Sequence, residues 1–325
     1  MAKIAINGFG RIGRQILKIA LKKKINIVAI NDLTDTETLA YLLEHDSIYG
    51  KFDGKIKAKK NSLIINGKEI QVFNEKDPSK LPWKKLKVDY VIEATGMFTD
   101  KADLHIKAGA KKVILTAPGK SSQITVVPGV NDNKLKKSHK IISVASCTTN
   151  ALAPVAHVLD KEFGIKKGFM TTVHAYTVSQ KILDGPHKKL RRGRAAGINI
   201  VPTTSGATTA VEQVIPKLKG KLNGLAMRVP VADGSIVDFV VELKKKTSAE
   251  MINGILRKYS KNKLKGIIEY SDDEIVSTDI IGNPNSAIVD GLSTMTIGNM
   301  AKVLIWYDNE YGYSARVVDV IKKLK

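Results

Sequence analysis

Three glycines near the N-terminus, Gly8, Gly10 and Gly13, constrain the fold more than any other feature of the sequence. They lie between a strand-like run at residues 2–7 and a helical pattern at residues 11–22. At such a junction the first glycine permits a tight turn, the second lets the backbone approach a pyrophosphate, and the third lets the helix pack on the strand. The N-terminus of the helix then presents unpaired N–H groups to the phosphates. We therefore expect a dinucleotide to bind at this turn.

A carboxylate follows the next predicted strand. Asp32 comes directly after the apolar run at residues 25–31, about 20 residues beyond the glycine turn. A carboxylate at this position accepts hydrogen bonds from the ribose hydroxyls of NAD and would repel the additional phosphate of NADP. The sequence therefore predicts NAD as the cofactor.

The first half of the chain alternates strand-like and helical segments, which is typical of a parallel sheet with helices on both faces. The strand-like runs are at residues 2–7, 25–30, 90–93, 113–116 and 141–145, and the helical patterns are at residues 11–22 and 101–108. This alternation predicts an α/β fold. At 325 residues, the chain is longer than the roughly 250–300 residues at which a single core stops growing, so a second domain is expected.

From about residue 168 the pattern changes to longer strands that few helices separate, which indicates a mostly antiparallel sheet. These strands are expected at residues 169–174, 225–229, 236–243, 294–297 and 301–307. Helices are expected at residues 208–218 and 248–259, and Thr247 with Glu250 would form a capping box at the start of the second. The polar stretch between residues 176 and 202 has little periodicity and is expected to be a functional or a disordered loop.

Composition limits the class of protein. The net charge of +22 comes mostly from scattered lysines without aromatic residues between them, which favours a solvated basic surface over a dedicated nucleic-acid site. Any nucleic-acid binding should be independent of sequence and strongly salt-dependent. No apolar run reaches the roughly 20 residues that a membrane span requires, and the N-terminus lacks the pattern of a secretory signal. We therefore expect a cytoplasmic protein without membrane contact.

Cys147 is the single cysteine of the chain, so neither an intramolecular disulfide nor a multi-cysteine metal site is possible, and no metal is expected. It lies in the run ASCTTN, between a predicted strand and a helical pattern at residues 151–159. A thiol at a helix N-terminus is expected to have a lowered pKa, which favours the reactive thiolate. A lone cysteine is often only a small buried hydrophobe, but this placement favours a nucleophile.

A nucleophilic thiol needs a base, and spacing alone does not choose among the histidines of this chain. The candidates are His45, His105, His139, His157, His174 and His187. His157 would lie within the helix that follows the thiol, so packing or surface exposure is the better interpretation of that residue. His174 ends a strand-like run that leads into the basic loop, which makes it the preferred base. A structural histidine at a strand end is the alternative.

Five sequence runs together resemble the glyceraldehyde-3-phosphate dehydrogenase family from one end of the chain to the other. They are NGFGRIGR (7–14), ASCTTN (145–150), TTVHAYT (171–177), LRRGRAA (190–196) and WYDNEYGYS (306–314). The resemblance implies that Cys147 attacks the aldehyde of glyceraldehyde 3-phosphate and that His174 withdraws the proton, through a thiohemiacetal and then a thioester. Hydride would pass to NAD, and inorganic phosphate would release the acyl group as 1,3-bisphosphoglycerate.

The resemblance also implies the contacts to the cofactor. Besides Gly8, Gly10 and Gly13, these are Arg11 and Ile12 at the pyrophosphate, Asp32 at the ribose, Lys76 and Thr116 on the adenine side and the sheet edge, and Asn309 at the nicotinamide amide. Lys76 stands where an arginine is more usual. A lysine keeps the charge but lacks the planar guanidinium, so stacking should be weaker at this position.

A phosphorylated substrate and inorganic phosphate require two cationic pockets. The resemblance places Arg228 and Thr177 in one pocket, and Thr148, Arg192, Ser205 and Gly206 in the other; Ser146 is also expected to bind substrate or phosphate. Ser205 replaces the usual threonine and Thr209 the usual lysine, so we expect weaker phosphate binding. Gly185 stands where some NAD-preferring relatives carry a leucine, so selectivity against NADP would depend mainly on Asp32.

The pattern and the resemblance together predict a Rossmann domain that binds NAD at residues 1–147, an α+β catalytic domain at residues 148–309, and a C-terminal helix at residues 310–325 that returns to the first domain. Family analogy implies a homotetramer. The nearest alternative function is oxidation of erythrose 4-phosphate, which the sequence distinguishes poorly. A basic nucleic-acid-binding protein on an enzyme scaffold is the alternative from another class, although the intact set of catalytic residues speaks against an inactive site.

Overall fold

A computed structural model describes residues 1–324, which form two compact units. Unit 1 comprises Met1–Val126, Lys134–Ala145 and residues 314–324, and unit 2 comprises Val127–Asn133 and Ser146–Tyr313. No helix within the described residues has both the length and the apolar character that a membrane crossing requires.

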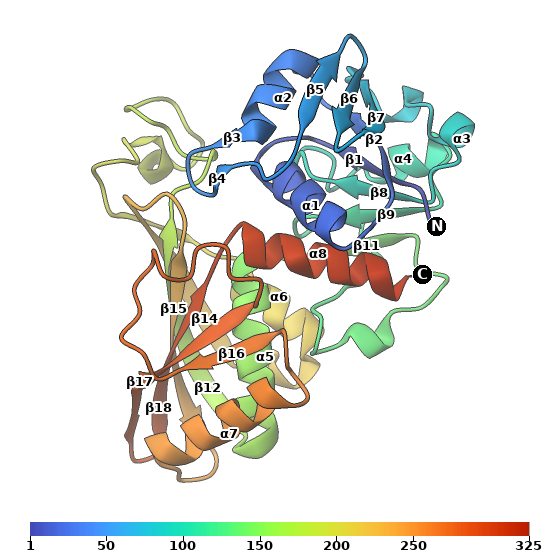
Figure 1. The fold of residues 1–325 in the computed structure, drawn as a ribbon. Helices are drawn as coiled ribbons and strands as arrows, with labels where there is room; N and C mark the ends of the chain where they lie inside the picture. The colour runs from blue at the N-terminus through green and yellow to red at the C-terminus, as the bar shows by residue number, and fades with distance from the viewer. Residues whose placement is uncertain (325) are drawn as a thin grey trace. The chain divides into compact units, whose positions relative to one another are not determined.

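Unit 1 contains a nine-stranded sheet, in which the predicted α/β pattern is confirmed (Figure 1). In sheet order the strands are β10 (Ile124–Thr125), β11 (Ile141–Ser143), β9 (Lys112–Leu115), β8 (Tyr90–Glu93), β1 (Ile4–Asn7), β2 (Ile27–Asn31), β7 (Lys68–Phe73), β6 (Ser62–Ile65) and β5 (Ile56–Lys59). Neighbours from β10 to β7 run parallel, and β6 and β5 are antiparallel additions. A separate pair, β3 (His45–Asp46) and β4 (Gly50–Lys51), lies outside this sheet.

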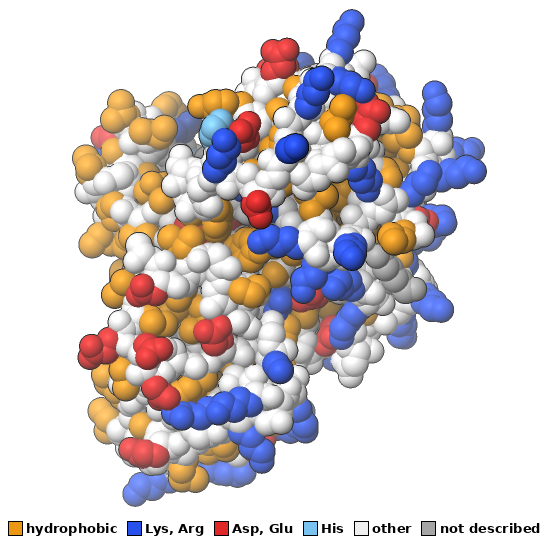
Figure 2. Space-filling view, in the orientation of Figure 1, with side chains coloured by type: hydrophobic (Ala, Val, Ile, Leu, Met, Phe, Trp, Pro, Cys, Tyr) orange, Lys and Arg blue, Asp and Glu red, His pale blue; other side chains and the backbone are white. Residues whose placement is uncertain are grey.

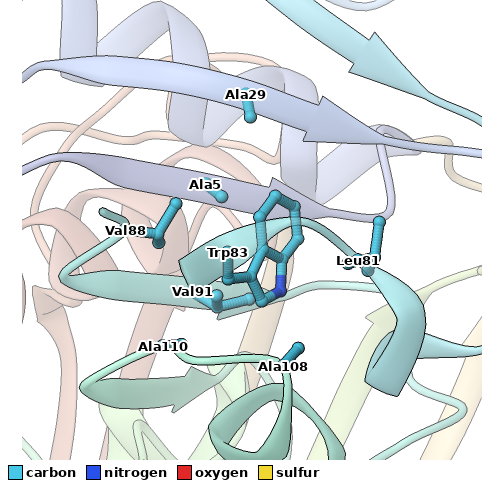
Figure 3. Packing of buried hydrophobic residues seen from close by; sticks show 8 residues of the cluster. All are labelled: Ala5, Ala29, Leu81, Trp83, Val88, Val91, Ala108 and Ala110. Carbon is cyan, nitrogen blue, oxygen red and sulfur yellow. The ribbon is translucent and has the colours of Figure 1, made fainter. Parts of the chain in front are cut away.

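The sheet of unit 1 packs against short and long helices. These are α1 (Arg11–Lys22), α2 (Thr36–Glu44), α3 (Trp83–Leu86), α4 (Asp103–Lys107) and most of α8 (Tyr311–Lys323), with a 3-10 turn at Pro78–Lys80. Every residue of β1 and β8 is buried, as expected for strands covered on both faces. Figure 3 shows the indole of Trp83 packed between the small side chains Ala5 and Ala29 of the strands and a second layer that contains Ala108.

Unit 2 contains a seven-stranded sheet, which confirms the predicted mostly antiparallel arrangement. Its order is β13 (Val201–Thr204), β14 (Leu222–Val229), β12 (Ile165–Ala175), β15 (Ser235–Leu243), β18 (Met300–Tyr307), β17 (Ala287–Ile297) and β16 (Ile268–Ser271). The pairs β12–β14 and β16–β17 run parallel, and the others are antiparallel. The parallel pair β12–β14 aligns His174 with Arg228.

Helices cover one face of this second sheet (Figure 1). They are α5 (Cys147–Glu162), α6 (Ala207–Val214) and α7 (Ala249–Lys261). Along β15, buried and half-buried side chains alternate from Ser235 to Leu243, which identifies the face that packs against the helices. The opposite face carries apolar side chains that remain exposed, such as Phe169 and Ile297.

Two predicted helix ends are wrong in detail. The helix expected at residues 208–218 stops at Val214, because the ring of Pro216 disfavours the helical conformation at Ile215, and Pro216–Leu218 forms a separate 3-10 turn. At the start of α7 the cap is Ser248, whose hydroxyl accepts a hydrogen bond from the Met251 N–H at 3.3 Å. The capping box assigned to Thr247 and Glu250 is therefore not formed.

Candidate active site

Cys147 is the first residue of α5, so the helix begins earlier than its apolar pattern indicated. Ser146 caps this helix, and its hydroxyl accepts a hydrogen bond from the Thr149 N–H at 3.1 Å. The cap fixes the position of the half-buried thiol next to it, and the Cys147 sulfur lies 3.5 Å from Nε2 of His174. The structure therefore brings together the cysteine and the histidine that the sequence analysis singled out. The hydroxyl of Ser146, which was expected at an anion, is used by the cap.

The orientation of His174 follows from its backbone neighbour. Its Nδ1 lies 2.7 Å from the carbonyl oxygen of Ala175. A neutral imidazole that carries its hydrogen on Nδ1 donates it to this carbonyl, which can only accept. The lone pair of Nε2 is then free to face the sulfur of Cys147. His174 is therefore placed to take a proton from the thiol.

Arg228 supports this orientation from the neighbouring strand. The register of β12 with β14 pairs His174 with Arg228 directly. The Nη1 atom of Arg228 donates to the Ala175 carbonyl at 2.8 Å and also contacts Nδ1 of His174. Among the described residues, the Arg228 Nε is buried and has no hydrogen-bond partner. A buried, unpaired donor on a cation fits an anionic group of a ligand.

Burial dominates the protonation of the reacting pair. It lowers the pKa of His174 to about 3, and the charge of Arg228 acts in the same direction. Burial also raises the pKa of the Cys147 thiol, more than the Arg228 charge and hydrogen bonds from Thr148 lower it. The expected lowering of the thiol pKa is therefore wrong for this structure, because desolvation of the thiolate outweighs its place at the helix N-terminus. Both shifts favour the neutral forms of the two groups.

Tyr307 is part of this site, although the sequence analysis named only Asn309 from the run that contains both. Its hydroxyl lies 2.9 Å from the Thr148 hydroxyl and 2.7 Å from that of Thr172. Its ring meets the imidazole of His174 edge-on, with centroids 5.9 Å apart. Burial raises the pKa of Tyr307, so its hydroxyl keeps its proton and can donate. Tyr307 thus holds Thr148 and the His174 ring in place from β18.

Asn309 joins the same site through one hydroxyl. Ser235 donates from its Oγ to Oδ1 of Asn309 at 2.6 Å, and its Oγ accepts the Ala175 N–H at 3.1 Å. With Oδ1 facing Ser235, the NH₂ group of Asn309 is left to donate elsewhere. Both backbone groups of Ala175 are therefore in use, one toward His174 and Arg228 and the other toward Ser235.

The remaining predicted anion ligands form a second group in unit 2. The Arg192 Nε donates to the Thr203 hydroxyl at 2.9 Å, which places the guanidinium beside the turn that contains Ser205 and Gly206. The Ser205 hydroxyl accepts the Ala207 N–H at 3.2 Å, at the start of α6. The charge of Arg192 also lowers the pKa of His174, so its field reaches the reacting pair.

Thr177 is not paired with Arg228, the residue with which it was predicted to form an anion pocket. In the described part of the chain its hydroxyl is paired with the Ser179 hydroxyl at 2.9 Å rather than with Arg228. Within residues 1–324, no group of three or more histidine, cysteine, aspartate or glutamate side chains is arranged to hold a metal ion.

The glycine turn of unit 1 has the conformation that a phosphate-binding turn requires. Gly8 has a φ of +92°, and a Cβ there would lie 2.7 Å from the Thr95 nitrogen. A Cβ at Gly13 would lie 2.1 Å from the Gly8 oxygen, so only glycine lets the helix approach this closely. At Gly10, which precedes α1, an added Cβ would meet no atom beyond its chain neighbours within 4 Å. The turn therefore leaves open space at the N-terminus of α1.

The other predicted cofactor ligands lie around this turn. The Asp32 carboxylate accepts the Phe9 N–H at 2.7 Å, which ties it to the glycine loop. The side chain of Arg11 is paired with the buried Asp46 at 2.9 Å, so the pyrophosphate contact expected of Arg11 would come from its backbone. Ile12 is half-buried, Lys76 is exposed, and the Thr116 hydroxyl donates to the Glu93 carbonyl at 3.0 Å.

Comparison with known proteins agrees with this geometry. Residues 2–101 match the family described as glyceraldehyde 3-phosphate dehydrogenase, NAD binding domain, and residues 146–309 match its C-terminal domain. A glyceraldehyde-3-phosphate dehydrogenase of Borreliella burgdorferi is 56% identical over 99% of both chains. One from Thermotoga maritima is 57% identical over all of this chain and 99% of its own. One from Geobacillus stearothermophilus is 54% identical over 98% of this chain and 96% of its own.

The matched regions include the glycine turn, the thiol, the imidazole and Asn309, and the relatives match over nearly their whole length. The chain therefore belongs to the glyceraldehyde-3-phosphate dehydrogenase family of NAD-dependent oxidoreductases.

Proposed function

We propose that this chain oxidises the aldehyde of glyceraldehyde 3-phosphate to 1,3-bisphosphoglycerate with NAD and inorganic phosphate. The observation that carries the proposal is the Cys147 sulfur, 3.5 Å from Nε2 of His174. Arg228 lies beside the imidazole with a donor to spare. A nucleophile, its base and a cation are the groups that covalent oxidation of an anionic aldehyde needs.

The thiol and the imidazole divide the first steps between them. The Cys147 thiol gives its proton to Nε2 of His174 while the sulfur bonds to the aldehyde carbon, and the carbonyl oxygen then takes up that proton. The product is a neutral thiohemiacetal. Nε2 next removes the hydroxyl proton as hydride leaves the carbon, which leaves a thioester on Cys147. NAD supplies the acceptor for this hydride.

Release of the acyl group completes the reaction. Inorganic phosphate attacks the thioester carbonyl, the carbon–sulfur bond breaks, and Cys147 regains a proton. In sum, aldehyde, NAD and phosphate give acyl phosphate, NADH and one proton. The N–H groups at the start of α5 have no partners within the helix and lie beside the sulfur, which favours charge on the attacked oxygen.

Each unit, taken by itself, contains residues that we assign to the cofactor. In unit 1 we assign the pyrophosphate to the N–H groups from Gly10 to Gly13, and the ribose to Asp32. Lys76 lies in the loop after β7 and Thr116 directly follows β9, and they are assigned to the adenine side and the sheet edge. In unit 2 the free NH₂ group of Asn309 is assigned to the carboxamide of nicotinamide.

NADH formation, followed by absorbance, tests the proposed function. We expect turnover that requires glyceraldehyde 3-phosphate, NAD and inorganic phosphate together. Turnover with erythrose 4-phosphate and none with glyceraldehyde 3-phosphate would replace the proposed substrate with the alternative one. NADH formation from neither aldehyde would contradict the proposal.

The two arginines should act on different anions. The two anions are the phosphorylated aldehyde and inorganic phosphate. We expect Arg192→Leu to raise the KM for one of them and Arg228→Leu to raise the KM for the other, each by about 10- to 100-fold, because each variant loses charge-assisted hydrogen bonds. Arg228→Leu should also lower kcat, since it releases the carbonyl to which His174 donates. Steady-state kinetics with each anion varied in turn measures both effects. An equal rise for the same anion in both variants would contradict two separate sites.

We also propose that the chain forms a homotetramer, because unit 2 exposes two apolar surfaces. The loop patch consists of Val178, Ile182, Leu183, Leu190 and Ile198, each at least 78% exposed. Figure 2 shows apolar side chains gathered over this segment, which Figure 1 draws in yellow-green. The second surface is the outer face of the sheet, with Phe169, Leu225, Met295, Ile297 and Met300. Exposed apolar patches of this kind mark association surfaces.

Light scattering after size exclusion measures the assembly. We expect a mass four times the 35.5 kDa of one chain. The pair of changes Ile182→Glu and Leu183→Glu should lower it, because carboxylates would be buried in the contact. Met251→Glu on α7, a matched change at an exposed apolar side chain outside both surfaces, should leave it unchanged. A wild-type monomer at micromolar concentration would contradict the proposal.

We place the protein in the cytoplasm, where a reducing environment keeps the Cys147 thiol free.

A further inference from the structure

A buried chain of polar side chains runs along the carboxyl ends of four neighbouring strands in unit 1. Glu93 ends β8, Asn7 ends β1 and Asn31 ends β2, and all three are at most 4% exposed. The strands lie in the order β8, β1, β2 and β7. Polar side chains are costly to bury unless they are hydrogen-bonded, so the partners of this group are informative.

The Glu93 carboxylate is the centre of this chain. Its Oε2 accepts from Nδ2 of Asn7 at 2.6 Å and lies 3.0 Å from Nε2 of His105. Its Oε1 accepts the Thr95 N–H at 2.8 Å and also the Thr95 hydroxyl. Donors from β1, from α4 and from the loop after β8 therefore converge on one side chain.

His105 connects the carboxylate to the apolar core behind it. The Trp83 Nε1 lies 3.1 Å from Nδ1 of His105. An indole can only donate, so Nδ1 accepts, and Nε2 must carry the hydrogen that it gives to Glu93. Trp83 itself is fully buried in the cluster of Figure 3. The carboxylate is therefore held from the inside by a side chain whose own position is fixed by packing.

Asn31 extends the chain of hydrogen bonds to the next two strands. Its Nδ2 donates to Oδ1 of Asn7 at 2.7 Å and to the Glu75 carbonyl at 2.9 Å. Its Oδ1 accepts the Glu75 N–H at 2.9 Å. The loop after β7 is thus fixed to β2 by both backbone groups of one residue.

Asn7, Asn31, Glu75 and Glu93 each adjoin a residue that we assign to NAD. Gly8 follows Asn7, Asp32 follows Asn31, Lys76 follows Glu75, and Thr116 donates to the backbone carbonyl of Glu93. The glycine turn also packs on the Thr95 backbone, which Glu93 holds. The side-chain hydrogen bonds therefore set the spacing between four cofactor-contacting segments.

We propose that Glu93 is a positioning residue for NAD: its buried carboxylate holds the strand ends of unit 1 in the arrangement that the adenosine and pyrophosphate contacts need. The inference rests on the cofactor contacts assigned under the proposed function. Glu93 acts through Asn7, Thr95 and Asn31, and the cofactor itself touches the residues beside them.

The variant Glu93→Gln tests this role with little change in shape. One carboxylate oxygen becomes an NH₂ group. Both oxygens accept hydrogen bonds, one from Asn7 and His105 and the other from Thr95, so in either orientation the NH₂ group points at donors. We expect the Kd for NAD, measured by calorimetry, to rise by at least about tenfold. The Kd for ADP-ribose, which lacks nicotinamide, should rise equally. At saturating NAD, kcat and the KM for the aldehyde should stay within about twofold, because Cys147 and His174 belong to unit 2.

Three further variants separate positioning from general stability. Trp83→Phe removes the donor to His105 but leaves all donors to the carboxylate, so it should lower Tm and leave the Kd for NAD unchanged. Combining Glu93→Gln with Asn7→Asp reverses the polarity of the 2.6 Å hydrogen bond and should recover part of the NAD affinity. Asn31→Ser cuts the chain at β2 and should weaken NAD in the same direction, even if Glu93→Gln does not fold.

The outcomes distinguish this inference from the proposed function. Wild-type protein that does not bind NAD would contradict the proposed function. Wild-type protein that binds NAD, with unchanged Kd in Glu93→Gln or in Asn31→Ser, would overturn only the positioning role. An equal loss of NAD affinity in Trp83→Phe and Glu93→Gln at equal loss of Tm would also overturn it, because the effect would then be general destabilisation.

Discussion

Replacing Cys147 with serine should lower kcat for aldehyde oxidation by on the order of 10⁴-fold or more. The hydroxyl has nearly the same size as the thiol, so α5 and its Ser146 cap should form unchanged. A serine hydroxyl is a far weaker acid than a thiol, so His174 removes its proton much less readily. Steady-state NADH formation measures the loss.

The same variant carries its own control. The Kd for NAD should remain within about twofold of the wild-type value, because Cys147 lies outside the unit that contains the glycine turn and Asp32. Loss of turnover with intact NAD binding would place the defect at the nucleophile. Retention of more than about one per cent of kcat would mean that another group attacks the aldehyde.

Replacing His174 with asparagine should lower kcat by about 10²- to 10⁴-fold, the usual contribution of a general base. An asparagine amide can still donate to the Ala175 carbonyl, which His174 contacts at 2.7 Å, so the backbone of β12 should be preserved. It offers no nitrogen lone pair to the thiol. Alkylation of Cys147 by iodoacetamide at pH 7 should slow as well, since the thiol pKa is raised and a base must remove the proton.

His157→Asn provides the matched control for this prediction. His157 lies within α5, in the same unit and half-buried, and burial lowers its pKa as it does that of His174. Because nothing places it at the thiol, its replacement should leave kcat within about twofold. Equal effects of the two substitutions would show that the loss in His174→Asn reflects a perturbed fold rather than a missing base.

The sequence was sufficient where a local pattern determines the structure. The glycine turn, the strand that ends before Asp32 and the thiol at a helix start all depend on neighbours along the chain. Unit 1 and unit 2 also follow their predicted sheet types, since alternation of apolar and polar positions reports burial directly. Resemblance added Arg228, and it supported His174, which its position at the end of a strand-like run already favoured.

What the sequence could not predict depends on contacts between distant segments. The pairing of His174 with Arg228 requires the register of β12 with β14, and this register has no signature in either strand alone. Tyr307 enters the site only because β18 lies beside β15 in the sheet. The direction of the thiol pKa shift depends on burial, which position at a helix start does not reveal.

The same limit applies to Glu93. From the sequence alone, a glutamate at the end of an apolar strand cannot be distinguished from an exposed carboxylate. Only the assembled sheet shows Asn7 and His105 on one of its oxygens. Buried polar contacts of this kind join residues that are far apart in the chain, so a pattern along the chain does not report them.

A single-turnover experiment without phosphate tests the central claim, a thioester on Cys147, most directly. Enzyme mixed with NAD and glyceraldehyde 3-phosphate should form one NADH per subunit in a burst and then stop, and turnover should resume when phosphate is added. Mass spectrometry of the stalled protein should find one 3-phosphoglyceroyl group on the peptide that contains Cys147. Sustained NADH formation without phosphate, or a burst that leaves Cys147 unmodified, would contradict the account.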